Sequence, residues 1–316
     1  MRRGADAVTV GIEVSRTRVT RRIRHSLPGW LFAAPWIIGF LLFTAGPMLY
    51  SIYLSLTSYD LLQPPRWIGL ENYSRLIDDP RVANSLKVTT VFSVVGVPLT
   101  MILGLGLALL LNQKIRGLNM WRTLFYLPAI VPAAAMGMLW RWLLDGQYGV
   151  INYSLKDWFG ITGPAWLSKD WVLPAFIIMS VWGVGVPMVI NLAGLQNIPE
   201  SLYEAAEIDG ASGWNKLWNI TLPLLSPVLF FNLLIGIVGA LQSFTIFYVV
   251  TKGGPRNASE TVMLYLYNNA FQFLNMGYAS ALAWMLFVYI LALTIIVYRF
   301  SSKWVYYESP VERMRV

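Results

Sequence analysis

Six stretches of this sequence contain no aspartate, glutamate, lysine, arginine or histidine, and this feature constrains the fold more than any other. The stretches cover residues 26–59, 88–113, 123–140, 171–199, 217–251 and 261–298. An α-helix rises about 1.5 Å per residue, so about 20 apolar residues cross a hydrocarbon layer about 30 Å thick. Five of the stretches are long enough to cross. We extend the third, shorter stretch through Leu144, because the long side chain of Arg141 can reach the membrane surface.

The last stretch begins with polar residues rather than apolar ones. They are Asn268, Asn269, Gln272 and Asn275. We therefore expect the last span at about 277–299 and a separate external helix or loop over 261–275. Strands of a membrane β-barrel would alternate between apolar and polar residues, whereas these stretches are continuously apolar. The sequence predicts an all-α membrane protein with six transmembrane helices over residues 26–301.

The composition agrees with a membrane location. Charged residues make up 13% of the chain, compared with roughly 25% in an average soluble domain. The chain has no cysteine and one histidine, His25, so we expect no disulfide, no catalytic residues, no metal ligands and no cofactor in this chain. The net charge of +8 could indicate nucleic-acid binding. Seven arginines precede residue 28, however, and that pattern fits membrane orientation better, so we expect no nucleic acid among the partners.

The distribution of positive charge predicts the orientation. If the N-terminus is inside, the inside segments hold fifteen of the 24 lysines and arginines and the outside segments hold nine. Lysine and arginine are enriched in cytoplasmic segments, so we expect both termini in the cytoplasm and a multi-pass protein of the inner (cytoplasmic) cell membrane. Residues 1–25 are predicted to be a disordered basic tail, and residues 302–316 a cytoplasmic C-terminal tail. The first span is predicted to be a retained anchor rather than a cleaved signal peptide.

Prolines occur inside several predicted spans. They are Pro35, Pro47, Pro98, Pro128, Pro132, Pro174, Pro187 and Pro227. Each removes a backbone hydrogen bond and can kink its helix. Proline is also simply tolerated in membrane helices, so the sequence leaves open whether these positions serve helix motion.

The predicted spans contain no ionisable residue away from their ends. Because intramembrane carboxylates and histidines mark proton relays, their absence argues against proton coupling; sodium coupling, which can use carbonyls and hydroxyls, is only weakened. The sequence has no G-x-x-x-x-G-K-[ST] stretch for ATP, and no paired carboxylates or His–Asp set at a membrane edge. A transporter that draws energy from a partner is therefore favoured over a self-sufficient transporter or channel, and over a membrane enzyme.

Residues 197–221 break the charge pattern. This segment should be cytoplasmic and basic, but it carries one cation, Lys216, against four acids. The acids are Glu200, Glu204, Glu207 and Asp209. Glu204 and Asp209 could accept charge-assisted hydrogen bonds from an arginine of a partner. The alternative interpretation is an ordinary surface hairpin with solvated charges.

The same segment predicts two short helices. Ser201-x-x-Glu204 matches a capping box, in which each side chain bonds a free backbone amide of the first turn. Gly210 suits the left-handed position that closes a helix. We expect a second helix to start near Ser212 and to stop before Pro223.

This segment also resembles a known family. Glu204-Ala205-Ala206-x-x-Asp209-Gly210-Ala211, followed by Ile220-x-Leu222-Pro223, resembles the EAA motif of binding-protein-dependent ABC permeases, with residue types and spacing in agreement over twenty positions. A phenylalanine is common in the family where this chain has Leu217 or Trp218, and both keep a bulky apolar side chain.

The resemblance extends from about residue 30 to residue 300. Segments that resemble the carbohydrate branch of the family are GPMLYSIYLSLTSYD (46–60), GLENY (69–73), LALLLNQKIRG (107–117), FYLPAIVPAAAMGMLWRWL (125–143), LAGLQNIPESLYEAAEIDGA (192–211), KGGPRNASETVMLYLYNNAF (252–271) and MGYASALA (276–283). The KGGP and LYLYNNAF stretches favour the first of the two permease subunits in maltose-, multiple-sugar- and glycerol-phosphate-type importers. The resemblance implies the type I ABC importer permease fold.

The resemblance also implies partners. They are a second permease subunit, two copies of an ATP-binding subunit that hold ATP and Mg, an extracytoplasmic substrate-binding protein, membrane lipid and a carbohydrate substrate. Residues 197–221 become the coupling loop, in which Glu204 is the salt-bridge partner of the ATPase and Gly210 is the turn. The ATPase-coupling residues are then Glu204, Ala205, Ala206, Asp209, Gly210 and Ala211.

Helices on either side of the coupling loop line the central pathway in the family, and here they are the fourth and fifth spans. A sugar site needs an aromatic platform and hydrogen-bonding groups in an otherwise apolar cavity. The candidates are Trp182, Gly183, Asn191, Asn232, Gln242, Ser243 and Phe247, with Ser243 and Trp182 preferred because family pocket positions fall near them. Asn, Gln and Ser also hydrogen-bond between membrane helices, which is the alternative role for each polar candidate. The sequence does not identify the sugar.

Overall fold

The computed structural model describes residues 32–113 and 116–306. The predicted basic tail 1–25, and the C-terminal tail beyond residue 306, lie outside the described residues. The part described is almost entirely helical, as predicted. Its one sheet is a two-stranded antiparallel ribbon of β1 (Thr57–Ser58) and β2 (Arg66–Trp67).

Five helices of the described chain are long and apolar enough to cross a membrane, and a bent helix pair makes a sixth candidate span. The spans are Phe32–Ser55, which contains the π-helical turn η1 (Leu41–Ala45) and α2 (Gly46–Ser55); α4 (Pro80–Leu111); the pair α5 (Leu118–Ile130) and α6 (Ala133–Leu143); α8 (Val172–Val181) with α9 (Gly185–Gln196); α11 (Gly213–Lys216), η2 (Leu217–Thr221), α12 (Leu222–Leu241) and α13 (Thr245–Val250); and α15 (Met276–Ser301). The remaining helices are α3 (Glu71–Asp78), α7 (Val150–Phe159), α10 (Glu200–Ile208), α14 (Val262–Tyr267) and η3 (Asn268–Gln272). The predicted break between 261–275 and the last span is present.

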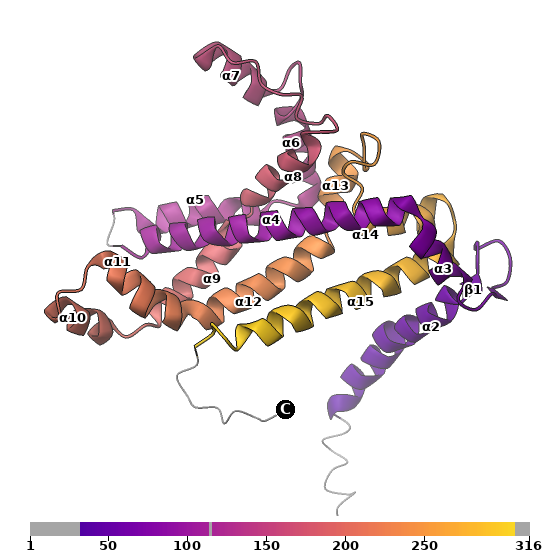
Figure 1. Ribbon diagram of the computed structural model, residues 1–316, viewed down its shortest axis with the longest axis horizontal. Helices are drawn as coiled ribbons and strands as arrows, with labels where there is room; N and C mark the ends of the chain where they lie inside the picture. Colours follow the sequence, from indigo (N-terminus) through magenta and orange to yellow (C-terminus); the bar gives the residue numbers. More distant parts are fainter. Residues whose placement is uncertain (1–31, 114–115, 307–316) are drawn as a thin grey trace, which may run out of the picture.

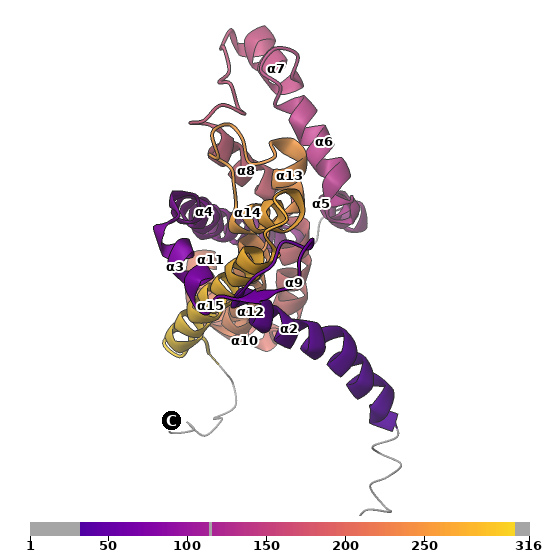
Figure 2. The ribbon, with the colours of Figure 1, turned by 90° about the vertical axis from the view of Figure 1, so that its right-hand side faces the viewer.

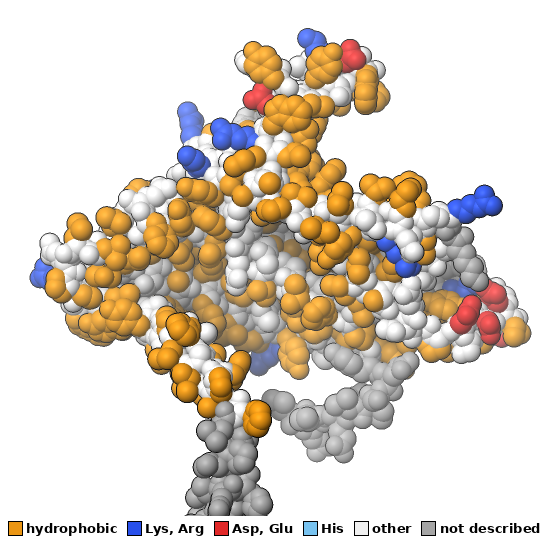
Figure 3. Space-filling view, turned by 180° about the vertical axis from the view of Figure 1, so that it is seen from behind, with side chains coloured by type: hydrophobic (Ala, Val, Ile, Leu, Met, Phe, Trp, Pro, Cys, Tyr) orange, Lys and Arg blue, Asp and Glu red, His pale blue; other side chains and the backbone are white. Residues whose placement is uncertain are grey.

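Helix α4 is the centre of the bundle. It packs against α8, α9 and α12 (Figure 1). Glycines permit the close approach that drives helix association in a membrane: a methyl group at Gly104 would press on Pro187 of α9, and one at Gly236 of α12 would press on Val97 of α4. Apolar side chains cover much of the sides of the molecule (Figure 3), as expected for a protein whose surface faces lipid.

The third span is not a single straight helix. The chain bends by 97° between α5 and α6, so the span predicted over 123–144 is a bent helix pair rather than one straight helix. The reason is Pro132: a residue before proline is disfavoured in helical conformation, and Val131 is extended, with φ −71° and ψ 129°. As a result, α6 packs against α13, and α7 beyond it stands away from the bundle in both ribbon views (Figures 1 and 2).

One end of the bundle carries α10 and α11, and we call it the hairpin end. The opposite end carries the ribbon, α3, and the loop of residues 251–261, and we call it the loop end. Helix α4 starts at the loop end and finishes at the hairpin end (Figure 1).

A glycine allows the ribbon to sit on α15 at the loop end. The amide of Gly277 donates to the carbonyl of Tyr59 at 3.2 Å, and any Cβ at position 277 would collide with the carbonyl of Thr57. Gly277→Ala is therefore expected to cost about 3 kcal/mol, the upper range for overpacking, because backbone atoms must move. Gly106→Ala, in α4 with open space around the glycine, is the matched control. The measurement is the melting temperature in detergent, monitored by size-exclusion chromatography. Equal melting temperatures for both variants and the wild type would contradict this account.

A partly buried ion pair joins α4 to the loop of residues 251–261. Glu260 is buried and accepts from Nη2 of Arg81 at 2.6 Å and from its Nε at 3.2 Å. Asp79, the N-cap of α4, accepts from the hydroxyls of Tyr265 and Tyr278 at 2.5 and 2.7 Å. Burial acts to raise the pKa of the Asp79 carboxyl, but these bonds and the amide of Arg81 outweigh it, and the pKa lies below its usual value.

Arg81→Ala should lower stability strongly because it leaves the buried Glu260 carboxylate without its cation. The Arg81 side chain is 38% exposed, so the expected cost is that of a buried group left unsatisfied, about 1–3 kcal/mol, rather than that of breaking a fully buried pair. Arg75→Ala serves as the control, since Arg75 stacks over the Tyr278 ring at 4.9 Å but makes no ion pair within the described chain. Equal melting temperatures for the two variants would show that the pair does not stabilise the fold.

Candidate functional site

A helical hairpin, α10 and α11, protrudes from one end of the bundle (Figure 1). Gly210, between the two helices, has φ +76°. The amide of Gly210 donates to the carbonyl of Glu207 at 3.0 Å, and the amide of Ala211 donates to that of Ala206 at 2.8 Å. This pair of bonds is the Schellman motif, which satisfies the last carbonyls of a helix and requires a left-handed residue. The predicted role of Gly210 in closing the first helix is therefore found.

The predicted capping box at the start of α10 is absent. The helix begins at Glu200 after Pro199, and no side chain caps it. Pro199 has extended ψ of 128°, so the chain enters the helix directly after it, and Ser201 already lies inside the first turn. Glu200 places a carboxylate in that turn, where the positive end of the helix dipole stabilises its negative charge.

The second helix does not stop before Pro223 as expected. Ser212 caps it, accepting from the amide of Asn215 at 3.3 Å, but the helix then continues through the π-helical turn η2 into α12. Pro223 falls in the first turn of α12, where its missing N–H is tolerated. The hairpin is thus covalently and structurally continuous with the fifth span, so a force on α11 acts directly on α12.

The hairpin presents acidic side chains to the outside. Figure 3 shows acidic side chains at the end of the molecule that carries α10. Glu207 pairs with Lys216 at 2.7 Å, and donation from Lys216 holds the pKa of Glu207 below its usual value. Glu204 and Asp209 are exposed and form no ion pair within the described chain. They are available for a cation on another protein.

The hairpin and the turn that follows it also expose large apolar side chains. Ile208 is 88% exposed, and Trp214 and Trp218 are 67% and 55% exposed. The two tryptophan rings pack edge to face with centroids 5.7 Å apart. Exposed tryptophan beside unpaired charge is typical of a protein-docking surface. The sequence analysis noted Trp218 only as a bulky replacement in the motif and did not consider Trp214 or Ile208. The signal available was the place of Ile208 between Glu207 and Asp209, and the presence of two tryptophans a few residues beyond Asp209.

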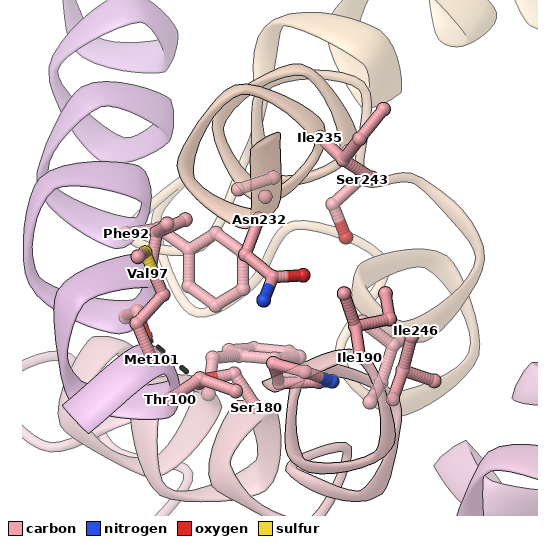
Figure 4. Close-up of a pocket in the computed structure, with 17 residues that line it drawn as sticks. Phe92, Val97, Thr100, Met101, Ser180, Ile190, Asn232, Ile235, Ser243 and Ile246 are labelled. Atoms are coloured by element: carbon pink, nitrogen blue, oxygen red, sulfur yellow. Dashed lines mark hydrogen bonds between the residues drawn. The ribbon is translucent and has the colours of Figure 1, made fainter. Parts of the chain in front are cut away.

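A cavity of about 350 Å³ opens among α4, α8, α9, α12 and α13. Figure 4 shows the Asn232 amide and the Ser243 hydroxyl pointing into it. Most of its wall is apolar, and α4 contributes Thr100 and Met101, which the sequence analysis did not include. A hydroxyl in the middle of the second span was the signal that could have found Thr100.

Four of the predicted pathway residues lie together in a recess beside the cavity. Trp182 and Gly183 line this recess together with Gln242 and Ser243. The Trp182 ring packs edge to face with the Trp140 ring, with centroids 5.7 Å apart.

Two of the candidates, Asn232 and Asn191, form a hydrogen bond with each other. Asn232 donates to the side-chain oxygen of Asn191 at 2.8 Å, which joins α12 to α9, and Asn191 is fully buried. This is the helix–helix contact that sequence left as the alternative. Phe247 is also fully buried, stacked on Phe176 at 4.0 Å. Contact with substrate stays a prediction for all seven, and burial disfavours it for Asn191 and Phe247.

A six-span bundle with this helical hairpin is the fold of type I ABC importer permeases. The family model described as the binding-protein-dependent transport system inner membrane component matches residues 96–305. The chain belongs to this family, and it is an integral membrane permease component.

Known relatives extend the match over nearly the whole chain. It is 42% identical to the probable ABC transporter permease protein YesP of Bacillus subtilis, over 98% of this chain and 99% of the relative. It is 36% identical to the sn-glycerol-3-phosphate transport system permease protein UgpA of Agrobacterium fabrum, over 88% of this chain and 96% of the relative. A crystal structure of a bacterial alginate ABC transporter, in complex with alginate pentasaccharide-bound periplasmic protein, has the same fold. It matches with a TM-score of 0.80 and 23% identity, over 90% of this chain and 98% of that one.

Proposed function

We propose that this chain is the permease subunit of an ATP-driven importer that moves a carbohydrate, or a sugar-like polyol phosphate, from an extracytoplasmic binding protein into the cytoplasm. The family membership supports transport that depends on a binding protein. Relatives named for sn-glycerol-3-phosphate, sulfoquinovosyl glycerol and starch degradation products support the substrate class.

The observation that carries this proposal is the hairpin. It offers the exposed carboxylate of Glu204 on α10 and exposed tryptophans further along, and it continues without a break into α12, which lines the cavity. A separate ATPase with an arginine facing Glu204 could therefore push on the fifth span. ATP and Mg would bind to that partner, and a second permease subunit would complete the pathway.

The hairpin end is then cytoplasmic, and the loop end faces the binding protein. The excess of lysine and arginine in the segments connected at the hairpin end supports this orientation. The cavity and the adjoining recess would be this subunit's share of the pathway, with Ser243, which lines both, and Trp182, which lines the recess, as the groups that meet the sugar.

The test is reconstitution of the purified complex into liposomes. Uptake of the sugar should require two additions. ATP must be on the side of the membrane that carries the hairpin and the ATPase, and the binding protein must be on the opposite side. Uptake by this chain alone, driven by an ion gradient, would instead support a self-sufficient transporter.

Ser243→Leu should slow uptake at least about ten-fold, because a branched side chain fills the cavity where the pathway is proposed, while complex assembly stays normal. Ser243→Ala is the matched control: it removes the hydroxyl but keeps the space, and the effect of one hydrogen bond is smaller. Initial uptake rates in vesicles measure both. Normal uptake by Ser243→Leu would place the pathway elsewhere.

A further inference from the structure

One side of α10 is turned toward the start of the fifth span. Most residues of α10 are exposed, but Tyr203 and Ala206 are half-buried. Residues three and four positions apart share one face of a helix, so Tyr203, Ala206 and Glu207 lie on the same side of α10. Glu204 follows Tyr203 about 100° further around the helix axis and is exposed. The side chain proposed to meet the ATPase therefore lies beside the face that meets the rest of this chain.

A chain of hydroxyl groups joins this face to the π-helical turn η2. The hydroxyl of Thr221 donates to the carbonyl of Lys216 at 3.3 Å, and the hydroxyl of Tyr203 lies 3.0 Å from that of Thr221. A hydroxyl group has one proton to donate. Because Thr221 uses its proton on the Lys216 carbonyl, Tyr203 donates to Thr221. Thr221 is 5% exposed, so water has little access to this bond.

A second contact closes a ring around the hairpin. Nζ of Lys216 donates to Oε1 of Glu207 at 2.7 Å, one helical turn beyond Tyr203. The ring runs from Tyr203 of α10 to Thr221, on to Lys216, and back to Glu207 of α10. The Glu207 side chain is 66% exposed, and exposed ion pairs contribute little to stability. The bond between Tyr203 and Thr221 is therefore the firmer of the two connections.

Few other contacts hold α10 in place. Among the elements of residues 32–113 and 116–306, none packs extensively against α10. The turn that joins it to α11 contains Gly210, and a Cβ at this position would meet no atom within 4 Å. Without the ring, α10 could turn about Gly210 while the fifth span stayed where it was.

We propose that Tyr203 and Thr221 are positioning residues that lock α10 to the fifth span. A displacement of α10 by the ATPase then moves α12, which lines the cavity, instead of turning α10 about Gly210. The inference rests on the proposed function, because it assigns the contact through which the hairpin acts on the pathway. Neither residue is among the six predicted ATPase-coupling residues.

The experiment is pulsed electron paramagnetic resonance on the whole complex in nanodiscs, with ATP and Mg as the probe. The chain has no cysteine, so Ser201→Cys on α10 and Phe231→Cys on α12, both exposed positions, can carry spin labels beside cysteine-free partner subunits. With Tyr203 intact, the distance between the labels should be narrowly distributed and unchanged by ATP and Mg. In Tyr203→Phe, the population at other distances should rise roughly five-fold when ATP and Mg are added, the effect of one lost hydrogen bond.

Variants of Thr221 separate the hydroxyl from the shape of the side chain. Thr221→Val should match Tyr203→Phe or exceed it, because it also loses the bond to the Lys216 carbonyl. Adding Tyr203→Phe to Thr221→Val should change nothing further, since both remove the same bond. Thr221→Ser keeps the hydroxyl and should restore the unchanged distance. Thr123→Val is the matched control, because the Thr123 hydroxyl donates at 2.9 Å to the carbonyl of Asn119 within one helix.

Distances in Tyr203→Phe and Thr221→Val that match those of the intact ring, with and without nucleotide, would overturn the proposal. So would a broad distribution when Tyr203 and Thr221 are both present, or a Thr221→Ser variant that behaves as Thr221→Val does. Loss of the ATPase subunit from the Tyr203→Phe complex would assign Tyr203 to docking and would overturn it too. A wild-type chain that recovers no ATPase would instead overturn the proposed function, while the label distance in that chain would still show whether the ring holds α10. The two failures are thus distinguishable.

Discussion

Glu204→Lys is expected to abolish ATP-driven uptake while the chain still inserts and folds. Glu204 is exposed on α10 and forms no ion pair within the described chain, so its replacement removes no internal contact. At the proposed interface, lysine would face the ATPase arginine that glutamate pairs with. Breaking a close charge pair at an interface costs about 2–5 kcal/mol, and reversing the charge adds repulsion.

Two measurements test this effect: the rate of uptake in cells, and the amount of ATPase subunit that co-purifies with the complex. Asp157→Lys is the matched control, because Asp157 is an exposed acid on α7, far along the chain from the hairpin. Glu204→Gln should be intermediate, since it loses the charge without reversing it. Wild-type uptake by Glu204→Lys would remove Glu204 from its assigned role.

Gly210→Val is expected to be the second most damaging change in the hairpin. A Cβ at this position meets no atom within 4 Å, so the effect is conformational rather than steric crowding. The left-handed conformation costs an L-residue about 1–2 kcal/mol, and more for a β-branched side chain. The Schellman bonds would loosen, and α10 would lose its fixed angle to α11.

A graded series tests this explanation. Asn tolerates the left-handed conformation better than other non-glycine residues, so uptake should fall in the order Gly210→Asn, Gly210→Ala, Gly210→Val. Uptake rates normalised to the amount of assembled complex give the comparison. Equal activity of the asparagine and valine variants would show that the turn conformation is not what matters.

The sequence predicted the six spans because continuous apolar stretches leave few alternatives in a membrane. It predicted the closure of α10 because Gly210 occupies a position with one favourable solution. It did not predict the sharp bend at Val131 and Pro132, since a proline in a membrane span is compatible with either a mild kink or a break. Tertiary surroundings decide between these outcomes.

The candidate site divides in the same way. The acidic hairpin was visible in sequence because its charge contradicts the positive-inside pattern. The cavity was visible only in part, since Thr100 comes from a helix distant in the chain from Ser243. Whether an asparagine faces a cavity or another asparagine, as Asn232 does with Asn191, depends on helix rotation, which local pattern does not fix.

Co-purification of the tagged chain in a gentle detergent, with mass spectrometry of the proteins recovered, tests whether this subunit depends on an ATPase. The account predicts recovery of a second permease and an ATP-binding subunit, and loss of the ATP-binding subunit alone when Glu204→Lys is used as bait. Recovery of this chain alone, folded and competent for transport, would contradict it.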